Sequence, residues 1–303
     1  MKFRKDEYMI TAEMLKNAII SASENISRYS DDVDNINIFP VPDGDTGTNL
    51  SLTFKGCAKA IADSDFTSAG SLADKAAEAF LRSARGNSGV IFSLIFKGFA
   101  KSVENLDEID AVSLAKALQA GSDEAYSTIE KPTEGTMLTV IRLASAKALS
   151  AASKGCTAEE TFLEALKGAE ASLKSTTNLL PTLKKHGVVD AGAQGLVYIM
   201  KGMANADSSA YRPQSAKSKN IRSSEKSEYI YCTEFLINSS DHKNIVSIRN
   251  RLSSIGDSTT VVGHSGIIKV HLHTNNPDKA LSTGLEHGEL SDIKIDNMRI
   301  QSE

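Results

Sequence analysis

Two aspartates, Asp43 and Asp45, flank a single glycine and have the clearest chemical potential in the sequence. Gly44 lets the backbone bend sharply, so both carboxylates can point at one place. Two prolines just before them exclude a helix there, and a helical pattern begins at Thr46. Carboxylate oxygens are hard ligands for Mg²⁺, and the first N–H groups of a helix attract anions. The segment therefore predicts a site for a magnesium ion and a phosphate group.

In this interpretation the amide and hydroxyl groups of residues 46–49 bind the phosphate oxygens. The candidate phosphate-binding residues are Thr46, Thr48 and Asn49. A tight turn followed by an ordinary helix cap is the alternative, and the pattern alone leaves it open. An EF-hand calcium loop is disfavoured, because the twelfth position counted from Asp43 is Phe54, where that loop needs a glutamate.

Small residues at the starts of later helical segments suggest further nucleotide contacts. Such positions let a phosphate or a ribose approach the backbone closely. Close helix packing and helix capping explain the same residues without any ligand. The candidate nucleotide-binding residues are Gly86, Asn87, Ser88, Gly89, Thr136, Met137 and Asp190.

A cysteine and two histidines form a candidate zinc site. His271 and His273 alternate with apolar residues of one predicted strand, so they share the face opposite the core with Lys269. Cys232 and Glu234 lie on the outer face of another predicted strand. In a ferredoxin-like sheet these strands are antiparallel neighbours, which brings the cysteine beside both histidines. One thiolate and two imidazoles suit Zn²⁺, with water, Glu234 or a ligand in the fourth position; two solvated histidines and a buried cysteine are the alternative.

The elements that position these residues divide the chain into two domains. A 3.6-residue apolar period predicts about eight helices and an all-helical domain over 1–204. The expected helices cover 10–30, 46–62, 71–84, 88–104, 111–129, 135–153, 158–175 and 192–204. Thr157 with Glu160 predicts a capping box, and Ser71 with Asp74 predicts another.

The remainder of the chain has a different pattern. Residues 205–228 are rich in Ser, Lys and Arg and predict a flexible linker. Residues 229–303 form a second domain in which strands alternate with helices. Strands are expected at 229–237, 258–262, 267–273 and 292–295, with helices at 242–254 and after 276. This βαββαβ order predicts a ferredoxin-like α/β domain, so the whole chain is a multidomain α and α+β protein.

Composition limits the classes of function. The 303 residues are 41% hydrophobic and 24% charged, typical of a globular protein, and the net charge of −4 argues against nucleic-acid binding. No apolar run approaches the length of a transmembrane segment, and no signal peptide is visible. The three cysteines are too few and too far apart for a disulfide framework, so we expect a cytoplasmic protein. The oligomeric state is left open, a homodimer included.

The run Asn37–Asn49 resembles the signature of the nucleotide-binding subunits of dihydroxyacetone kinases. It is still more similar to the bacterial fatty acid kinase A family, the ATP-binding subunit of fatty acid kinase. Further segments match the same family and together span most of residues 10–204. They are 85–91 (RGNSGVI), 131–138 (KPTEGTML) and 189–195 (VDAGAQG). The resemblance implies an N-terminal eight-helix antiparallel α-barrel with ATP bound at one end.

The resemblance also implies roles for individual residues. Asp43 and Asp45 would be the catalytic residues and would bind one or two Mg²⁺ ions. Asn37 would be a further ligand at a place where the dihydroxyacetone kinase subunits have an aspartate nearby. Segments 231–235 and 270–274 resemble the middle domain of fatty acid kinase A, whose matching cysteine and two histidines bind zinc; here they are Cys232, His271 and His273.

The function implied is transfer of the γ-phosphate of ATP to the carboxylate of a fatty acid. A separate lipid-binding partner protein would hold the fatty acid, and the acyl phosphate would serve phospholipid synthesis. The alternatives are a kinase subunit of the dihydroxyacetone type and a non-catalytic regulatory adaptor that depends on nucleotide. Family members continue into a C-terminal domain that this sequence lacks, so we expect the chain alone to be inactive without that domain and the partner.

Overall fold

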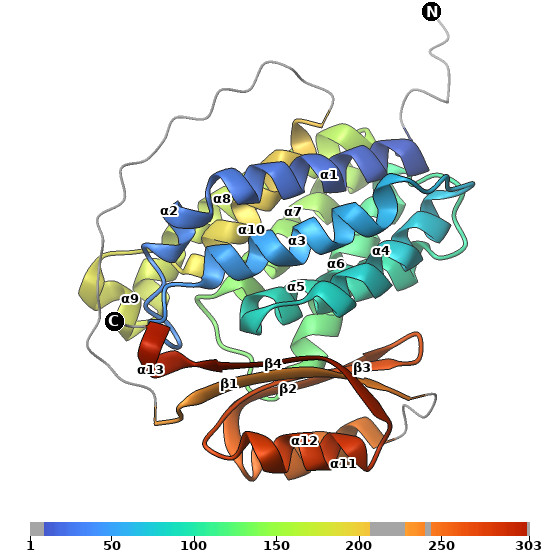
Figure 1. The fold of residues 1–303 in the computed structure, drawn as a ribbon. Coiled ribbons are helices and arrows are strands. Elements are labelled where there is room, and N and C mark those ends of the chain that lie inside the picture. The colour runs from blue at the N-terminus through green and yellow to red at the C-terminus, as the bar shows by residue number, and fades with distance from the viewer. Residues whose placement is uncertain (1–8, 207–227, 240–243, 302–303) are drawn as a thin grey trace, which may run out of the picture.

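A computed structural model describes residues 9–206, 228–239 and 244–301. Most of the expected linker, 205–228, and the first residues of the expected helix 242–254 therefore lie outside the described residues. Figure 1 shows a bundle of long helices above a four-stranded sheet, with two further helices below the sheet. This is the predicted order of an all-helical part followed by an α/β part.

Eight long helices close into a ring. Along the chain each long helix packs against the next, and the last, α10, packs against the first, α1. The ring consists of α1 (Ala12–Arg28), α3 (Thr46–Ala62), α4 (Ala69–Ser83), α5 (Gly86–Val103), α6 (Ala111–Thr128), α7 (Met137–Ser153), α8 (Ala158–Leu179) and α10 (Ala191–Ala204). The closed ring confirms the eight-helix barrel. Two short helices, α2 (Ser30–Asp34) and α9 (Pro181–His186), were not predicted, because fewer than two turns show no apolar period.

Local capping explains where several helices begin. The predicted capping box at the start of α8 is present, since Thr157 and Glu160 each accept a hydrogen bond from the backbone N–H of the other. The box predicted for Ser71 and Asp74 is wrong. The actual N-cap of α4 is Ser68, whose hydroxyl accepts a hydrogen bond from the Ser71 N–H. The cap therefore lies three residues before the predicted one.

The core of the barrel contains a cluster of aromatic rings. Phe54 of α3, Phe80 of α4 and Phe92 of α5 pack with ring centroids 4.6–5.1 Å apart, and Phe54 and Phe80 are completely buried. Three consecutive long helices are thereby tied together at their inner faces. An apolar cavity of about 670 Å³ lies beside them, between α1, α5 and the start of α8.

The second part of the chain forms one antiparallel sheet in the order β2-β3-β1-β4. The strands are β1 (Tyr231–Asn238), β2 (Gly256–His264), β3 (Ile267–Thr274) and β4 (Glu289–Asn297). Helices α11 (Ile245–Ser253) and α12 (Pro277–Leu285) pack on one face, and the short α13 (Met298–Gln301) follows β4. This order confirms the ferredoxin-like βαββαβ topology. Ser265 and Gly266, both with positive φ, make the predicted tight turn between β2 and β3.

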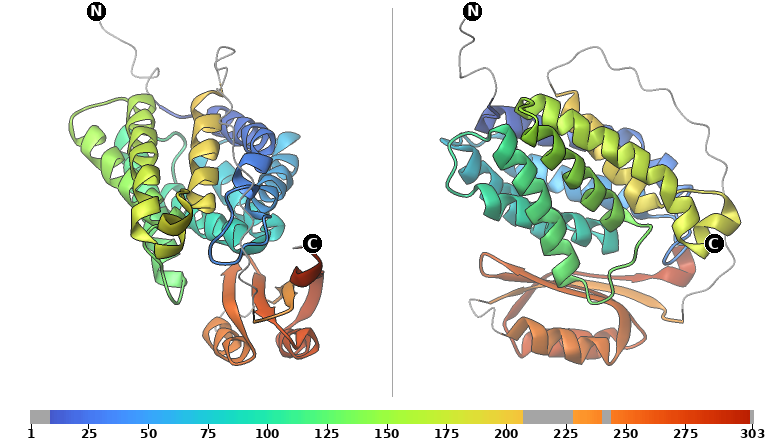
Figure 2. Two further views of the ribbon diagram at one scale, coloured as in Figure 1. Left: turned by 90° about the vertical axis from the view of Figure 1, so that its left-hand side faces the viewer. Right: turned by 180° about the vertical axis from the view of Figure 1, so that it is seen from behind.

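The other face of the sheet is covered by the helical bundle, as the two views of Figure 2 show. Helix α5 contacts β2 and β3, and Val262 of β2 belongs to the core of the bundle. This face was predicted to lie outside the core of its own domain. The contact with α5 buries it nonetheless, so that Lys269 and His271 are 0% and 1% exposed.

None of the helices in the described part of the chain combines the length and the apolar character needed to cross a membrane.

We expect Phe80→Ala to lower the free energy of unfolding by about 3–5 kcal/mol, because it leaves a cavity among the rings that join α3, α4 and α5. Leu149→Ala on the exposed side of α7 is the control, with an expected change within about 0.5 kcal/mol. Urea unfolding of the full chain measures both values. Similar costs for the two variants would contradict this description of the core.

Candidate functional site

The bend between the two aspartates has the conformation that the sequence predicted. Gly44 has a φ of +69°, which glycine adopts without strain. The Asp45 carboxylate lies close enough to Asp43 to help raise the pKa of the Asp43 carboxyl group. The two side chains therefore converge on one place.

Asn37 holds this loop in shape. Its buried amide donates to the Val41 carbonyl oxygen at 2.7 Å and to Asp43 Oδ1 at 3.0 Å, and its oxygen accepts the hydroxyl of Thr46. In the structure Asn37 thus organises the loop instead of presenting a free amide oxygen. Its role as a magnesium ligand stays a prediction.

The electrostatics of the pair favour a cation. Burial raises the pKa of Asp43 to about 8, and the neighbouring Asp45 carboxylate acts in the same direction. A positive charge close to two neighbouring carboxylates favours the ionised form of both. A divalent cation would supply that charge.

Asp34, which the sequence analysis missed, caps the start of α3. Its Oδ1 accepts the N–H groups of Gly47 at 2.6 Å and Thr48 at 3.1 Å, and its Oδ2 accepts the Thr48 hydroxyl at 2.7 Å. In this structure the N–H groups of Gly47 and Thr48 and the Thr48 hydroxyl are thus bonded to Asp34, and phosphate binding by residues 46–49 stays a prediction. The signal was the acidic run 31–34, but its effect depends on how α2 folds back onto α3.

The second glycine loop lies directly against the first motif. A Cβ on Gly86 would come within 2.4 Å of the Asn49 amide nitrogen, so only glycine permits this approach. The N–H of Arg85 donates to the Thr53 hydroxyl of α3 at 3.0 Å. The start of α5 is thereby fixed beside the start of α3.

At the start of α5, the described part of the chain shows no acceptor for the N–H groups of Asn87 and Ser88, whereas Gly89 N–H is bonded to the Arg85 carbonyl oxygen. These two N–H groups are the remaining donors for an anion at this helix end.

The third and fourth motifs meet at Asp190. This fully buried carboxylate accepts the Ala193 N–H at 2.8 Å, which makes it the N-cap of α10, and it also accepts the N–H of Met137. Burial raises the pKa of Asp190 to about 7. Thr136 is the N-cap of α7. The capping interpretation of Asp190 is thus correct, whereas the cap expected at Thr133 is Thr136 instead; the role of Thr136 and Asp190 as nucleotide contacts stays a prediction.

All four motifs lie at one end of the bundle. Helix α10 contacts α2, α3 and α7, and a Cβ on Gly195 would meet Leu50 of α3 at 2.3 Å. The starts of α3, α5, α7 and α10 therefore surround one region, as the resemblance implied.

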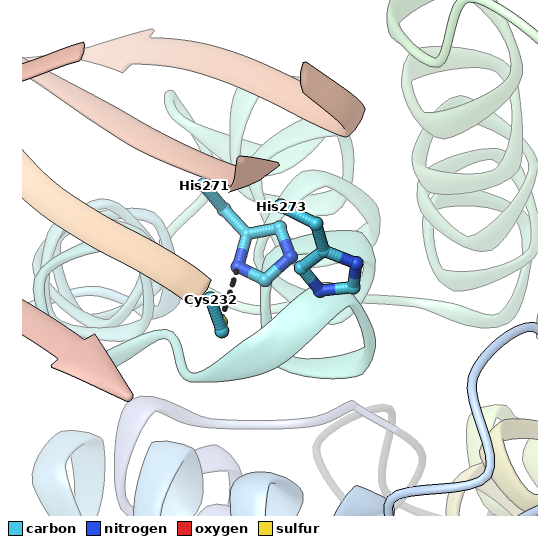
Figure 3. A group of neighbouring side chains, drawn as sticks. All are labelled: Cys232, His271 and His273. Atoms are coloured by element: carbon cyan, nitrogen blue, oxygen red, sulfur yellow. Dashed lines mark hydrogen bonds between the residues drawn. The ribbon is translucent and has the colours of Figure 1, made fainter. Parts of the chain in front are cut away.

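The cysteine and the two histidines come together as the strand order predicted. Cys232 of β1 lies opposite His273 of β3, and Figure 3 shows the three side chains grouped on one face of the sheet. Their candidate ligand atoms all lie within 4.8 Å of one another, and Cys232 Sγ is 3.8 Å from His271 Nδ1. His271 Nε2 and His273 Nδ1 are buried without a hydrogen-bond partner among the described residues.

The thiol of Cys232 is not ionised by its surroundings. Burial raises its pKa, and the Glu234 and Asp45 carboxylates raise it further. A metal ion would be needed to hold it as a thiolate. The effect of Asp45 also shows that the acidic loop of the bundle lies within electrostatic reach of this cluster.

Glu234 is not available as a fourth metal ligand, because its carboxylate is already engaged. Oε1 accepts the Gly86 N–H at 2.6 Å and lies 3.0 Å from His271 Nδ1, while Oε2 lies near Lys269 and Arg85. Although burial opposes ionisation, the His271 hydrogen bond and the Lys269 charge hold the pKa of Glu234 well below its usual range. Arg85 was another residue that the sequence analysis missed.

Comparison with protein families agrees with this division of the chain. A model of the DAK2 domain matches residues 40–205, which include all four loops. The chain belongs to the DAK2 domain family. A second model, for the middle domain of proteins like fatty acid kinase A, matches residues 228–303, which include the cysteine and both histidines.

Known relatives of this DAK2 protein are longer. An uncharacterised protein of Staphylococcus saprophyticus is 38% identical over 308 residues, covering 96% of this chain and 56% of the relative. Protein YloV of Bacillus subtilis is 37% identical over 301 residues, covering 93% of this chain and 54% of the relative. The chain thus spans about half the length of the curated relatives it matches.

Among solved structures, the dihydroxyacetone kinase of C. freundii in complex with AMP-PNP and Mg²⁺ matches with a TM-score of 0.49 and 20% identity. That match covers 68% of this chain and 36% of the kinase. It is too distant to support an argument about function.

We expect the stability of the metal-free protein to fall as the pH rises from about 4 to 8. The folded-state pKa of Asp43, about 8, lies above its unfolded value, so its contribution is present at low pH and lost as pH rises through 8. Asp190 acts in the same direction. Each pKa unit corresponds to about 1.4 kcal/mol, or roughly 3–6 °C in Tm for a domain of about 200 residues.

Thermal unfolding of wild type, Asp43→Asn and the exposed control Asp65→Asn measures this effect. The slope of Tm against pH should be shallower in Asp43→Asn alone, and added Mg²⁺ should flatten the wild-type slope. Equal slopes in all three proteins would show that Asp43 is ionised without cost.

Proposed function

We propose that the chain is the ATP-binding and phosphoryl-transferring part of a fatty acid kinase. The acceptor is the carboxylate of a fatty acid presented by a separate lipid-binding protein, and the product is an acyl phosphate for phospholipid synthesis. The family matches support a kinase-related protein with a fatty acid kinase-like middle domain. The observation that carries the proposal is that the Asp43 and Asp45 carboxylates lie within electrostatic reach of each other in the loop before α3, whose Asn49 packs against Gly86 of α5.

The residues present fit Mg²⁺. Two adjacent carboxylates are a hard oxygen donor set, and burial together with the neighbouring Asp45 raises the pKa of Asp43, as expected of a pair without a cation beside it. Asp43 and Asp45 would hold one or two ions, and bound Mg²⁺ would neutralise charge on the transferred phosphoryl group. Asn37 keeps Asp43 in place through its amide.

The glycine loops would bind the nucleotide by close backbone approach. Asn87 and Ser88 offer N–H groups at the start of α5. Gly86 and Gly89 have neighbours so close that a Cβ atom at either position would clash with them. Thr46, Thr48 and Asn49 at the start of α3 would contribute further contacts, as would Thr136, Met137 and Asp190 at the starts of α7 and α10. Because Asp34 already caps α3, we assign the phosphate chiefly to α5.

A carboxylate acceptor suits this site chemically. An ionised carboxylate is already a nucleophile, so the reaction needs positioning and charge neutralisation, without a general base. The described residues around the acidic loop accordingly provide carboxylates and backbone donors. The partner protein must deliver the fatty acid to the region between the bundle and the sheet.

We also assign a zinc site to Cys232, His271 and His273. The fit rests on the buried His271 Nε2, which has no hydrogen-bond partner among the described residues, and on candidate ligand atoms that lie within 4.8 Å of one another. Because Glu234 can only accept, His271 Nδ1 carries the proton of their hydrogen bond, which leaves Nε2 with a lone pair for the metal. Zinc would act as a Lewis acid or a structural centre beside the acidic loop.

The test of the kinase is acyl phosphate formation by the chain with a fatty acid-loaded partner, Mg²⁺ and ATP, trapped with hydroxylamine. Asp43→Ala and Asp45→Ala should each reduce kcat/KM at least about 100-fold, because charge stabilisation at the phosphoryl group is lost. The exposed control Asp65→Ala should keep wild-type activity.

Two outcomes would contradict the proposal in different ways. Phosphorylation of dihydroxyacetone with a cognate partner, while fatty acid stays inert, would identify a kinase subunit of the dihydroxyacetone type instead. No turnover and no thermal shift with Mg²⁺ and ATP would favour a regulatory adaptor.

The zinc assignment predicts one zinc ion per chain in the wild type and loss of that ion in Cys232→Ser, since a hydroxyl does not replace the thiolate. Cys156→Ser, in the turn between α7 and α8, is the matched control and should keep full zinc content. Elemental analysis of the purified proteins measures the ratio. Equal zinc in both variants would show that the metal is bound elsewhere.

A further inference from the structure

Glu234 makes contacts in both halves of the molecule although it is only 2% exposed. Its Oε1 accepts the backbone N–H of Gly86 at 2.6 Å, across the interface with α5. The same oxygen lies 3.0 Å from Nδ1 of His271, within its own sheet. One carboxylate oxygen thus touches the glycine loop of the bundle and a member of the cysteine–histidine cluster.

The contact with Gly86 replaces a cap that α5 lacks. The N-cap residue of α5 is Arg85, whose side chain makes no capping hydrogen bond to the helix. A carboxylate at a helix start satisfies an N–H group and opposes the positive end of the helix dipole. The first turn of α5, which contains the loop Gly86–Gly89, is therefore positioned by a residue 148 positions later in the chain.

The second oxygen of Glu234 is held by cations from the same two sides. Lys269 Nζ of β3 lies 3.4 Å from Oε2, and Arg85 Nη1 of the bundle lies 3.5 Å from it. Lys269 is completely buried, so it has no aqueous alternative to this partner. The bonds of Oε1 to Gly86 and His271 set the orientation of the carboxylate, and the two cations near Oε2 balance its charge.

We propose that Glu234 is a positioning residue that couples the metal site at Cys232, His271 and His273 to nucleotide binding at the start of α5. A metal bound by His271 orders its ring, the ring orders the carboxylate, and the carboxylate fixes the Gly86 N–H. The ligand that binds second then meets a loop that is already ordered, and the two ligands bind cooperatively. This inference rests on the proposed zinc and nucleotide sites.

A through-space effect of the zinc charge on the triphosphate is the competing explanation. It needs no contact through Glu234 and would survive the loss of that side chain. The two explanations therefore make different predictions for a variant that keeps both ligand sites but lacks the Glu234 carboxylate between them.

The charge-balanced double variant Glu234→Met, Lys269→Met removes the connection. Methionine fills a similar volume and accepts no hydrogen bond from Gly86, and replacing both partners avoids an unpaired buried charge. The single variant Lys269→Met is the matched control, because it keeps Glu234 and its bonds to Gly86 and His271. Arg85 remains in both variants. In Lys269→Met it is the countercharge of Glu234, and in the double variant its partly exposed side chain can turn to solvent.

The experiment is calorimetric titration of the full chain with Mg²⁺ and a nonhydrolysable ATP analogue, before and after removal of zinc. In wild type and Lys269→Met, zinc should lower the Kd of the nucleotide at least about 5-fold. In the double variant both ligands should still bind, but zinc should change the Kd by less than about twofold. Hydrogen exchange at Gly86 should slow with zinc in the wild type and not in the double variant; a purely structural role would not make this exchange depend on zinc.

An unchanged zinc effect in the double variant, or no zinc effect in the wild type, would overturn the inference. If the double variant does not unfold cooperatively, the same titration is done with Glu234→Gln. A smaller effect of zinc on the nucleotide Kd is expected in this variant, and an effect as large as in the wild type would contradict the inference. A wild type that binds no nucleotide or no zinc at all would instead disprove the proposed function, and the inference with it.

Discussion

The rest of the site depends on the forced proximity of Asp43 and Asp45. Their carboxylates lie close together in a half-buried loop, and this proximity helps to raise the pKa of Asp43. The local structure maintains this arrangement: Gly44 makes the bend, and Asn37 bonds to the backbone, to Asp43 and to Thr46 at once. The proposal of a cation-binding site follows from two like charges held together in this short loop.

Acidic groups also cap the helices that surround this loop. Asp34 caps α3, Asp190 caps α10, and Glu234 reaches from the sheet to cap α5. The helix ends that could attract a triphosphate are thus partly neutralised by carboxylates. Under the proposed function, nucleotide binding at this end of the bundle would depend on metal ions, and the N–H groups still available at α5 would decide where the phosphates lie. Glu234 of the sheet would then lie beside the nucleotide, because it caps α5.

The elements predicted correctly are those that follow from local rules. Helix 46–62 was predicted to the residue, and the strand alternation placed His271 and His273 on one face. What the sequence could not show depends on contacts between distant segments. Asp34 acts through the packing of α2 on α3, and the burial of Lys269 follows from an interface that no periodicity encodes. Strand register was predictable from topology, whereas the partners of Glu234 were not.

The most direct measurement of the central claim is a crystal structure with Mn²⁺ in place of Mg²⁺ and a nonhydrolysable ATP analogue. The account predicts an anomalous peak about 2.0–2.2 Å from carboxylate oxygens of both Asp43 and Asp45, with the phosphates on its other side. Aspartate side chains directed to solvent, with the nucleotide bound elsewhere or absent, would contradict it.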